Sequence, residues 1–369
     1  MARRGEYYGS YADAGRRQRR RVGLMTLLDA VLLMVSVVVM LFFVALLVMS
    51  HLSPETAGMF AALGLYSLYL YVAMLILVLY WLARWRLVNV AVMGVVLVVG
   101  LFSLPSYYKM EIDKQHKTKY PRSFKLLSYN MDELSLQEDE VGFDSLRSFV
   151  FREMPNIVTL QNAYQVDSVD SLLRVKRFKQ MEYTKKRGNE ALAIYSRYPF
   201  AKRHAVDSLQ NMIWCDIVAD DDTIRIYNVL LHMDNYEVDA RSGERVVPER
   251  TIGERMKAWS EQSSYRVKEM DSLMPYITSS PYPCVVAGSL NDIPFTFVYN
   301  KLADDLVDAY VEKGHGYSHT YSGYEEGLRL DYVFVSESIE VLSYEVLYDV
   351  DMALHYPLFV RFNEKDKHK

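Results

Sequence analysis

The stretch that decides the fold is Val285-Val-Ala-Gly-Ser-Leu-Asn-Asp292, in which an apolar run ends in a glycine and a group of small polar residues. Such a short apolar run is typical of a buried strand. Ser289, Asn291 and Asp292 then lie where the strand ends. Functional sites are usually built on strand ends and on the loops that follow them. The stretch therefore predicts a buried strand that carries a candidate site.

Further strands and helices alternate on both sides of this stretch. Residues 141–154 and a longer segment around residues 256–274 have the spacing of amphipathic helices. A hairpin is predicted across the acidic turn Asp220–Asp222. The predicted strands are Phe124–Tyr129, Asn156–Leu160, Glu190–Ser196, Met212–Ala219, Thr223–Leu231, Cys284–Ala287, Leu330–Val335, Leu342–Tyr348 and Tyr356–Phe362. This order predicts an α/β domain in which helices cover mixed sheets.

Polar residues follow most of the predicted strands, and each has an ordinary explanation when taken alone. Asn130 and Asn291 can cap turns. Arg329 and Asp331 can form a surface pair, and His355 can be a loop residue. The full set is Asn130 and Asp132, Gln161 and Asn162, His232 and Asp234, Ser289, Asn291 and Asp292, Arg329 and Asp331, and His355. Their order and surroundings favour one shared site.

Eight motifs carry these residues along residues 120–362. They are Lys125-Leu-Leu-Ser-Tyr-Asn130, Pro155-Asn-Ile-Val-Thr-Leu-Gln161, Ala193-Ile-Tyr-Ser-Arg-Tyr-Pro199, Ile224-Arg-Ile-Tyr-Asn228, Val285-Val-Ala-Gly-Ser-Leu-Asn-Asp292, Thr320-Tyr-Ser-Gly323, Arg329-Leu-Asp-Tyr-Val-Phe-Val335 and His355-Tyr-Pro357. This succession resembles the endonuclease/exonuclease/phosphatase superfamily, which includes DNase I-like nucleases, sphingomyelinases and inositol-phosphate phosphatases. The resemblance implies an α/β four-layer sandwich, with two mixed β-sheets face to face and helices outside.

The resemblance also implies a reaction, the hydrolysis of a phosphate ester by in-line attack of water. Such chemistry needs a divalent metal held by carboxylates, a base near the water and donors around the phosphate. Asn130 and Asn291 match the phosphate-binding and site-orienting asparagines of the family. Asp331 and His355 match its Asp–His pair, in which the carboxylate holds the imidazole and favours its charged form.

Four positions depart from the family's pattern. Asn162 stands where the family has its principal metal ligand, a glutamate, and Leu230 replaces a histidine that assists the phosphate or leaving group. Ser289 replaces the aspartate that orients or deprotonates water, and Leu354 replaces another carboxylate of the metal site. Amide, hydroxyl and alkyl groups bring no negative charge. The departures therefore predict that Mg²⁺ or Mn²⁺ is not tightly held.

Neighbouring residues offer a partial replacement for the lost groups. Asp132 matches an acidic position used near the metal in one branch of the family, so Asp132 and Asn162 are the weak candidates for metal ligands. His232 lies two residues after Leu230, so on a strand it faces the same side, about 7 Å further on. Asp292 directly follows Asn291 and is expected to face away.

These residues lead to three functional hypotheses. In the first, the domain is catalytically impaired and acts as a phosphate-ligand-binding or scaffolding module. In the second, it is an active phosphoesterase that uses Mg²⁺ or Mn²⁺ and a site rebuilt from Asp132, His232, Asp331 and His355. Its substrate is then a lipid headgroup or a small phosphate ester. In the third, N-terminal apolar helices carry the function and the domain docks a protein partner.

Charge separates this domain from the first 105 residues. Residues 1–23 carry seven arginines against Glu6 and Asp13, whereas residues 106–369 carry a net charge of −9. An acidic domain repels phosphate backbones, which disfavours nucleic acid as a partner. Cys215 and Cys284 both fall in apolar strands, so they are expected to be core residues without a disulfide.

Three apolar stretches, Leu24–Ser50, Ala57–Ala83 and Leu87–Pro105, approach the length of about 20 residues that crosses a bilayer as a helix. The third is the shortest. We therefore predict three transmembrane helices, at about residues 24–50, 57–83 and 87–105, which makes membrane lipids the first expected partner. A basic tail of residues 1–23 precedes them, and a linker of residues 106–123 leads to the domain of residues 124–369.

Arginines predict the orientation, because positive residues stay on the cytoplasmic side. They cluster in Arg16–Arg21 and at Arg84 and Arg86, whereas the loop His51–Glu55 has none. The N-terminus and second loop are then cytoplasmic. The C-terminal domain is extracytoplasmic, and periplasmic in a Gram-negative bacterium.

Asp29 lies in the first apolar stretch. An intramembrane carboxylate is a functional candidate by default. The ordinary explanation is an interfacial residue near water or Arg21, because Asp29 is only about a turn and a half from the basic edge. Both interpretations remain open at this point.

Overall fold

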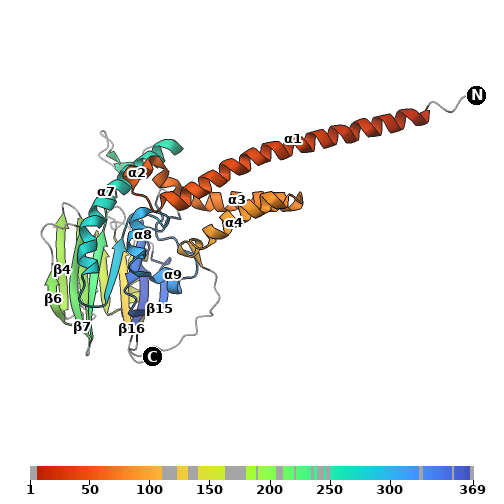
Figure 1. Ribbon diagram of the computed structural model, residues 1–369. Helices are drawn as coiled ribbons and strands as arrows, with labels where there is room; N and C mark the ends of the chain where they lie inside the picture. Colours follow the sequence, from red (N-terminus) through yellow and green to blue (C-terminus); the bar gives the residue numbers. More distant parts are fainter. Residues whose placement is uncertain are drawn as a thin grey trace, which may run out of the picture. The chain divides into compact units, whose positions relative to one another are not determined.

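The computed structural model describes residues 6–109, 123–131, 140–162, 180–187, 190–204, 211–219, 222–233, 237–238, 245–246, 250–323, 327–350 and 353–365. The chain forms two compact units (Figure 1). The helical unit comprises Met1–Leu47 and Leu65–Leu101. The sandwich unit comprises Val48–Gly64 and Phe102–Lys369.

The helical unit is built from α1 (Glu6–Met49), α3 (Ser67–Ala83) and α4 (Leu87–Leu101). Two helical stretches have the length and composition to cross a membrane, Met25–Met49 with a mean hydropathy of 3.3 and Pro54–Ala83 with 2.2. The third predicted span is a shorter apolar helix, α4, with 15 residues. It ends at Leu101, and Pro105 follows in a short 3₁₀ turn of residues 104–106.

Asp29 joins α1 to α3 within the helical unit. Its Oδ1 accepts from Tyr80 Oη at 2.6 Å and from Arg84 Nε at 3.0 Å, and its Oδ2 accepts from Arg84 Nη2 at 2.7 Å. On α4, a Cβ at Gly100 would lie 2.5 Å from the ring of Phe43, so this glycine lets two helices approach closely. The bonds from Tyr80 and Arg84 give Asp29 a structural role in the association of α1 with α3.

The sandwich unit contains two six-stranded sheets, and both are mixed. The first sheet has the order β12 (Val307–Asp308), β14 (Asp331–Val335), β11 (Cys284–Ser289), β8 (Asp222–Leu230), β7 (Met212–Ala219) and β6 (Phe200–His204). The second has the order β15 (Ile339–Val346), β16 (Leu358–Glu364), β2 (Phe124–Asn130), β3 (Ile157–Gln161), β5 (Glu190–Ser196) and β4 (Gln180–Arg187). The two mixed sheets and their helices fit the DNase I-like fold that the resemblance implies.

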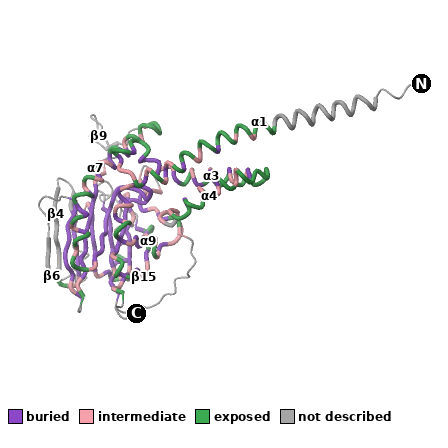
Figure 2. The backbone as a smooth tube through the Cα atoms, viewed as in Figure 1, coloured by how far each residue is buried: buried purple, intermediate pink, exposed green. Residues whose placement is uncertain are grey.

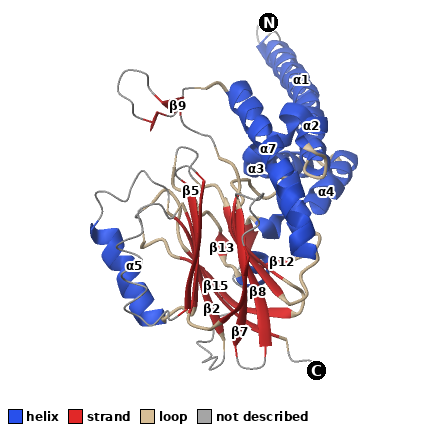
Figure 3. Cartoon of the chain, turned by 90° about the vertical axis from the view of Figure 1, so that its left-hand side faces the viewer, coloured by secondary structure: helices blue, strands red, loops and turns tan. Residues whose placement is uncertain are grey.

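Helices cover the outer faces of the two sheets. Figure 3 shows α5 (Glu140–Glu153) outside one sheet and α7 (Ile252–Thr278) outside the other. Two shorter helices, α8 (Phe297–Ala303) and α9 (Ala309–Lys313), follow β11 and β12 in the chain. The layers therefore run helix, sheet, sheet, helix.

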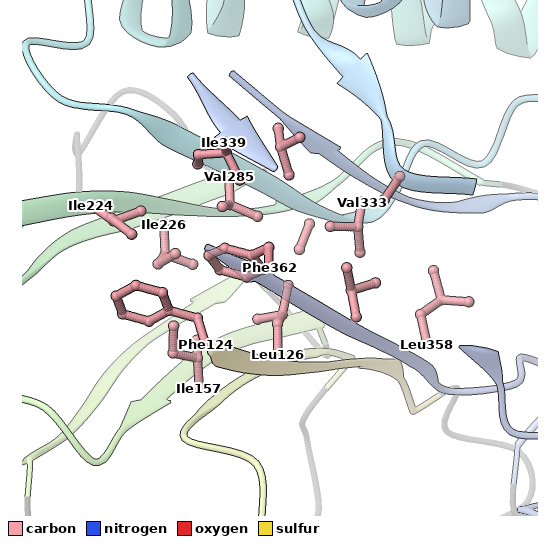
Figure 4. Close-up of a cluster of buried hydrophobic side chains, with 14 of the residues drawn as sticks. Phe124, Leu126, Ile157, Ile224, Ile226, Val285, Val333, Ile339, Leu358 and Phe362 are labelled. Atoms are coloured by element: carbon pink, nitrogen blue, oxygen red, sulfur yellow. The ribbon is translucent and has the colours of Figure 1, made fainter. Parts of the chain in front are cut away.

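The core between the sheets follows from the alternation of side chains along each strand. On β8, Ile224, Ile226 and Leu230 pack between the sheets, whereas Tyr227 and Val229 face the cluster that includes α7. Figure 4 shows the inter-sheet cluster, and Figure 2 shows that buried residues concentrate in the strands. Cys215 and Cys284 are both buried in the core, as the sequence predicts.

Two segments outside the predicted domain boundaries belong to the sandwich unit. The turn η2 (Leu104–Ser106) leads into β1 (Tyr108–Lys109), which pairs with β13 (Gly316–Tyr317). Residues 106–109 are thus part of the fold, although the sequence analysis places them in a linker. Earlier in the chain, α2 (Pro54–Ala57) and the 3₁₀ helix η1 (Gly58–Tyr66) stand where a continuous helix from residue 57 is predicted. The backbone at Gly58 has a φ of +58°, which interrupts the helix.

The α2–η1 segment packs on the elements around β11. Gly58 O accepts from Ser260 Oγ of α7 at 2.7 Å. Ser50 O accepts from Asn300 Nδ2 of α8 at 2.9 Å. Gly64 lies against the loop that follows β11, with its Cβ position 3.0 Å from Ile293 Cδ1. The connection between the two long apolar helices is therefore part of the sandwich unit.

Gly288 marks a close approach between β11 and β8. Its φ is +141°, and a Cβ there would lie 1.9 Å from Val229 O. We expect Gly288→Ala to lower the free energy of unfolding by about 3 kcal/mol, because the parallel ladder must open to admit the methyl group. The measurement is urea unfolding of the detergent-solubilised chain. Gly253→Ala is the control, since a Cβ there meets no atom within 4 Å. Equal stability of the two variants would contradict the explanation.

Candidate functional site

Strand register brings the predicted site residues to one end of the two sheets. Ser289 on β11 is aligned with Leu230 on β8 and with Asp331 on β14. In the other sheet, Asn130 on β2 is aligned with Gln161 on β3. Both alignments follow from strands that end at corresponding positions. The sequence motifs therefore meet because their polar residues lie at strand termini at the same end of the two sheets.

Five of these residues form a continuous hydrogen-bonded series, which we call the strand-end chain: Asn162, Asn130, Ser289, Asp331 and His355. Asn162 Nδ2 donates to Asn130 Oδ1 at 2.8 Å, and Asn130 Nδ2 donates to Ser289 Oγ at 2.8 Å. The Ser289 hydroxyl donates to Asp331 Oδ1. His355 Nδ1 lies 2.8 Å from Asp331 Oδ2. The strand-end chain thus joins the second sheet to the first.

These contacts fix the tautomer of His355. Asn130 Nδ2 lies 3.3 Å from His355 Nε2, and an amide nitrogen can only donate. His355 Nε2 is therefore the acceptor, and Nδ1 carries the proton that is donated to Asp331. The ring is thus held between Asp331 at Nδ1 and Asn130 at Nε2. His355 is 1% exposed and Asp331 4% exposed, so little water competes with these bonds.

Thr320 belongs to the site, although its sequence motif alone does not identify it as a site residue. Its hydroxyl donates to Asp331 Oδ2 at 2.6 Å and accepts from Leu330 N and Asp331 N, both at 3.0 Å. The ring of the next residue, Tyr321, packs edge-on against His355 with centroids 4.9 Å apart. The signal was present in the motif Thr320-Tyr-Ser-Gly323. Both oxygens of Asp331 are thereby occupied.

Asn291 lies near the series but is bonded elsewhere. Its Nδ2 donates to Leu231 O at 2.7 Å, and its backbone has a φ of +51°. Its Oδ1 is buried and has no hydrogen-bond partner among the described residues. The structure therefore places Asn291 beside β8 and gives it no bond to Asn130, Ser289, Asp331 or His355 within the described part of the chain.

A second polar contact joins the sheets. Gln161 Nε2 donates to Asn228 Oδ1 at 2.6 Å. Asn228 Nδ2 in turn donates to Leu160 O at 2.8 Å and to Ala193 O at 2.9 Å. All four residues are buried. Gln161 and Asn228 therefore have a structural role in closing this end of the sandwich.

His232 and Asp292 contact α7 on the outer side of the first sheet. The His232 ring packs against Tyr265 with centroids 5.6 Å apart. Asp292 Oδ2 accepts from Arg266 Nε at 3.1 Å and from Ser263 Oγ at 2.7 Å. Asp292 thus faces away from the site, as expected. His232 is not brought to Leu230's side, because β8 ends at Leu230 and strand alternation does not continue.

Leu230, Leu354 and Arg329 are the remaining predicted residues that the structure describes. Leu230 packs in the inter-sheet core, and Leu354 is half-buried, with its carbonyl accepting from Ser322 N at 2.7 Å. Asp132 and Asp234 lie outside the described residues. Arg329 and Asp331 are not a surface pair, because Arg329 is fully buried and its Nη2 donates to Asp308 Oδ1 at 2.6 Å.

Among the residues that the structure describes, those at the site do not fit a tightly bound Mg²⁺ or Mn²⁺. These ions need several oxygen ligands, with carboxylates supplying negative charge. Asp331 is the one carboxylate of the strand-end chain, and it already bonds to Ser289, Thr320 and His355. Across the described ranges, no three His, Cys, Asp or Glu residues lie close enough to hold a metal. Asn162 can offer a neutral oxygen only.

The tautomer of His355 gives a direct test of this geometry. We expect the ¹⁵N spectrum of the histidine-labelled chain at neutral pH to show a protonated Nδ1 and an unprotonated Nε2 for His355. His355→Gln assigns the signal. In Asn130→Leu the donor to Nε2 is lost, so the Nε2 shift is expected to change while the Nδ1 proton stays. An imidazolium spectrum in the wild type would contradict the assigned hydrogen bonds.

Comparisons with known proteins agree with this architecture. The model of the Endonuclease/Exonuclease/phosphatase family matches residues 127–352. No curated protein matches the chain. One similar solved structure is an endonuclease/exonuclease/phosphatase family protein from Bacteroides thetaiotaomicron, with 15% identity, a TM-score of 0.46 and coverage of 65% of this chain and 97% of that chain.

Two further similar structures are of proteins described as phosphatases. A 3′ phosphatase from Neisseria, bound to a product DNA hairpin, has 16% identity and a TM-score of 0.47, with 65% of this chain and 99% of that chain covered. A mannosyl-6-phosphatase from Bacteroides thetaiotaomicron has 15% identity and a TM-score of 0.45, with 65% and 100% covered. Because the family model spans more than half of the chain, this protein belongs to the Endonuclease/Exonuclease/phosphatase family.

Proposed function

We propose that this protein is a membrane-anchored family member whose domain is catalytically impaired and acts as a scaffolding module outside the cytoplasm. The observation that carries the proposal is the strand-end chain, in which groups that would meet metal and substrate are bonded to one another.

Impaired hydrolysis is supported by the bonds of Ser289 and His355. Attack by water needs a base near the water and positive charge near the phosphate. The Ser289 hydroxyl accepts from Asn130 and donates to Asp331, so it is held as a structural link. His355 Nε2 accepts from Asn130, so it presents no proton to a phosphate. Neither residue is placed to activate water.

Scaffolding is favoured over capture of a phosphate ligand by the direction of the donors. A phosphate needs N–H or O–H groups that point at it. Both Nδ2 contacts of Asn130 and the hydroxyls of Ser289 and Thr320 are directed at neighbouring side chains. Ser289 is fully buried and Asn130 is 2% exposed. A binding role would therefore use another surface of the domain.

Anchoring is supported by the way the chain returns to the sandwich unit. Residues 48–64 and residues 102–369 belong to the same compact unit, so they lie on the same side of a bilayer. The chain between them must then cross an even number of times. This requirement favours α3 and α4 as a pair of spans, even though α4 has 15 residues. The preference of arginines for the cytoplasmic side, applied to Arg84 and Arg86, favours a domain outside the cytoplasm.

The alternative is an active metal-dependent phosphoesterase, and one contact favours it. The Asp331–His355 pair is retained at 2.8 Å, as an active family member would require. Its proposed replacement group His232 is packed against Tyr265, and both oxygens of Asp331 already accept hydrogen bonds that a metal would have to displace. The pair is thus explained more simply as part of the strand-end chain.

Metal titration separates the two candidates. We expect the detergent-solubilised wild-type chain to show no saturable Mn²⁺ binding by calorimetry and no hydrolysis of bis-p-nitrophenyl phosphate. In Asn162→Glu/Ser289→Asp, two carboxylates return beside Asp331, and Mn²⁺ is expected to bind with a Kd below about 1 mM. Ser289→Ala is the matched control, because it breaks the link to Asp331 without adding charge.

The outcomes of this titration are distinguishable. A wild type that binds Mn²⁺ and turns over the diester at about 1 s⁻¹ or faster would overturn the proposal. If the double variant is folded by circular dichroism and still binds no Mn²⁺, the loss of binding is wrongly assigned to these two positions.

A further inference from the structure

Five aromatic side chains gather on the surface of the sandwich unit: Tyr108, Tyr317, His319, Tyr348 and Tyr356, which we call the tyrosine patch. The His319 ring stacks on Tyr348 with centroids 4.6 Å apart and on Tyr317 at 5.9 Å. Tyr356 packs edge-on against Tyr348 at 5.2 Å. Tyr108 is aligned with Tyr317 across the β1–β13 ladder, so their side chains share a face.

Three members of the tyrosine patch are exposed on the surface of the domain. Tyr108 is 47% exposed, Tyr348 43% and Tyr317 39%. Five rings held together in this way would be expected to bury more of their area if they served the core alone. The patch is therefore an aromatic surface with room for a partner.

The tyrosine patch carries no charge of its own at neutral pH. Burial lowers the pKa of His319, so its ring stays neutral at neutral pH. Burial also raises the pKa of Tyr348, so its hydroxyl stays protonated. The patch thus combines apolar ring faces with neutral hydroxyl groups.

Chain length restricts where this surface can lie. The apolar helix α4 ends at Leu101, and Tyr108 follows seven residues later. Even a fully extended segment of that length spans no more than about 25 Å. The turn η2 (Leu104–Ser106) shortens the path. If α4 ends at the bilayer surface, the tyrosine patch cannot be far from it.

We propose that the tyrosine patch rests in the headgroup layer of the bilayer on the non-cytoplasmic side. Tyrosine is enriched at this depth, because its ring enters the apolar boundary while its hydroxyl stays with water and headgroups. The inference rests on the proposed membrane anchoring, and it adds a lipid-contact surface to the domain itself.

Contact at this patch would also orient the strand-end chain. His319 directly precedes Thr320, which donates to Asp331, and Tyr356 directly follows His355. The tyrosine patch and the strand-end chain are therefore built on the same two segments. A domain seated on the patch presents this end of the sandwich to the membrane surface.

Spin labels on the full chain in phosphatidylcholine nanodiscs test the proposal. Cys215 and Cys284 are buried, so single introduced cysteines can be labelled selectively. Asp349→Cys reports on the patch without removing a ring. Glu340→Cys is the control: Glu340 is exposed on β15, Asp349 is exposed in the turn after that strand, and most of the strand separates them. Leu41→Cys, at a position 61% exposed on α1, reports on anchoring.

We expect the label at residue 349 to collide with a water-soluble nickel chelate at least about threefold less than the label at residue 340. Replacing Tyr317 and Tyr348 by serine should remove the difference. If residue 41 is inaccessible to nickel and residues 349 and 340 are equally accessible, the patch inference fails and anchoring stands. If residue 41 is accessible as well, the proposed anchoring fails and the inference fails with it.

Discussion

The hydrogen bond from Ser289 to Asp331 is the contact on which this end of the molecule depends. A buried carboxylate is stable only when its oxygens are satisfied. Asp331 receives the hydroxyls of Ser289 and Thr320 and the Nδ1 proton of His355. Ser289 also accepts from Asn130, which connects the two sheets. We propose that serine here, in place of the aspartate that the resemblance implies, closes the interior instead of serving catalysis.

The same replacement changes what the family's fold can do. An aspartate at position 289 would stand beside Asp331 and would need a cation to offset the repulsion between the two carboxylates. Serine removes that need, because its hydroxyl donates to Asp331, which an aspartate at this position would repel. Leu230, aligned with Ser289 on the adjacent strand, extends the apolar core to this point. In the proposed function, stability without a metal and loss of metal chemistry would have one physical origin.

Much of this arrangement could be predicted from the sequence, because strand ends with polar residues meet when the strands are aligned. The sandwich and the meeting of Asn130, Ser289, Asp331 and His355 follow from the motifs. The part played by Thr320 could not be predicted, since it depends on side-chain direction in a loop. The Arg84 partner of Asp29 lies 55 residues away, and only helix packing reveals it. Strand β4 (Gln180–Arg187) is mostly polar, so its sequence lacks the apolar pattern that predicts a strand.

The most direct test of the account is a crystal structure of the full chain grown with millimolar Mn²⁺ and recorded near the manganese absorption edge. Anomalous scattering locates the ion without assumptions about protonation. The account predicts no manganese peak beside Asp331, with Ser289 and His355 still bonded to its two oxygens. A manganese ion ligated by Asp331 within about 2.3 Å, with Asn162 in its coordination shell, would contradict it.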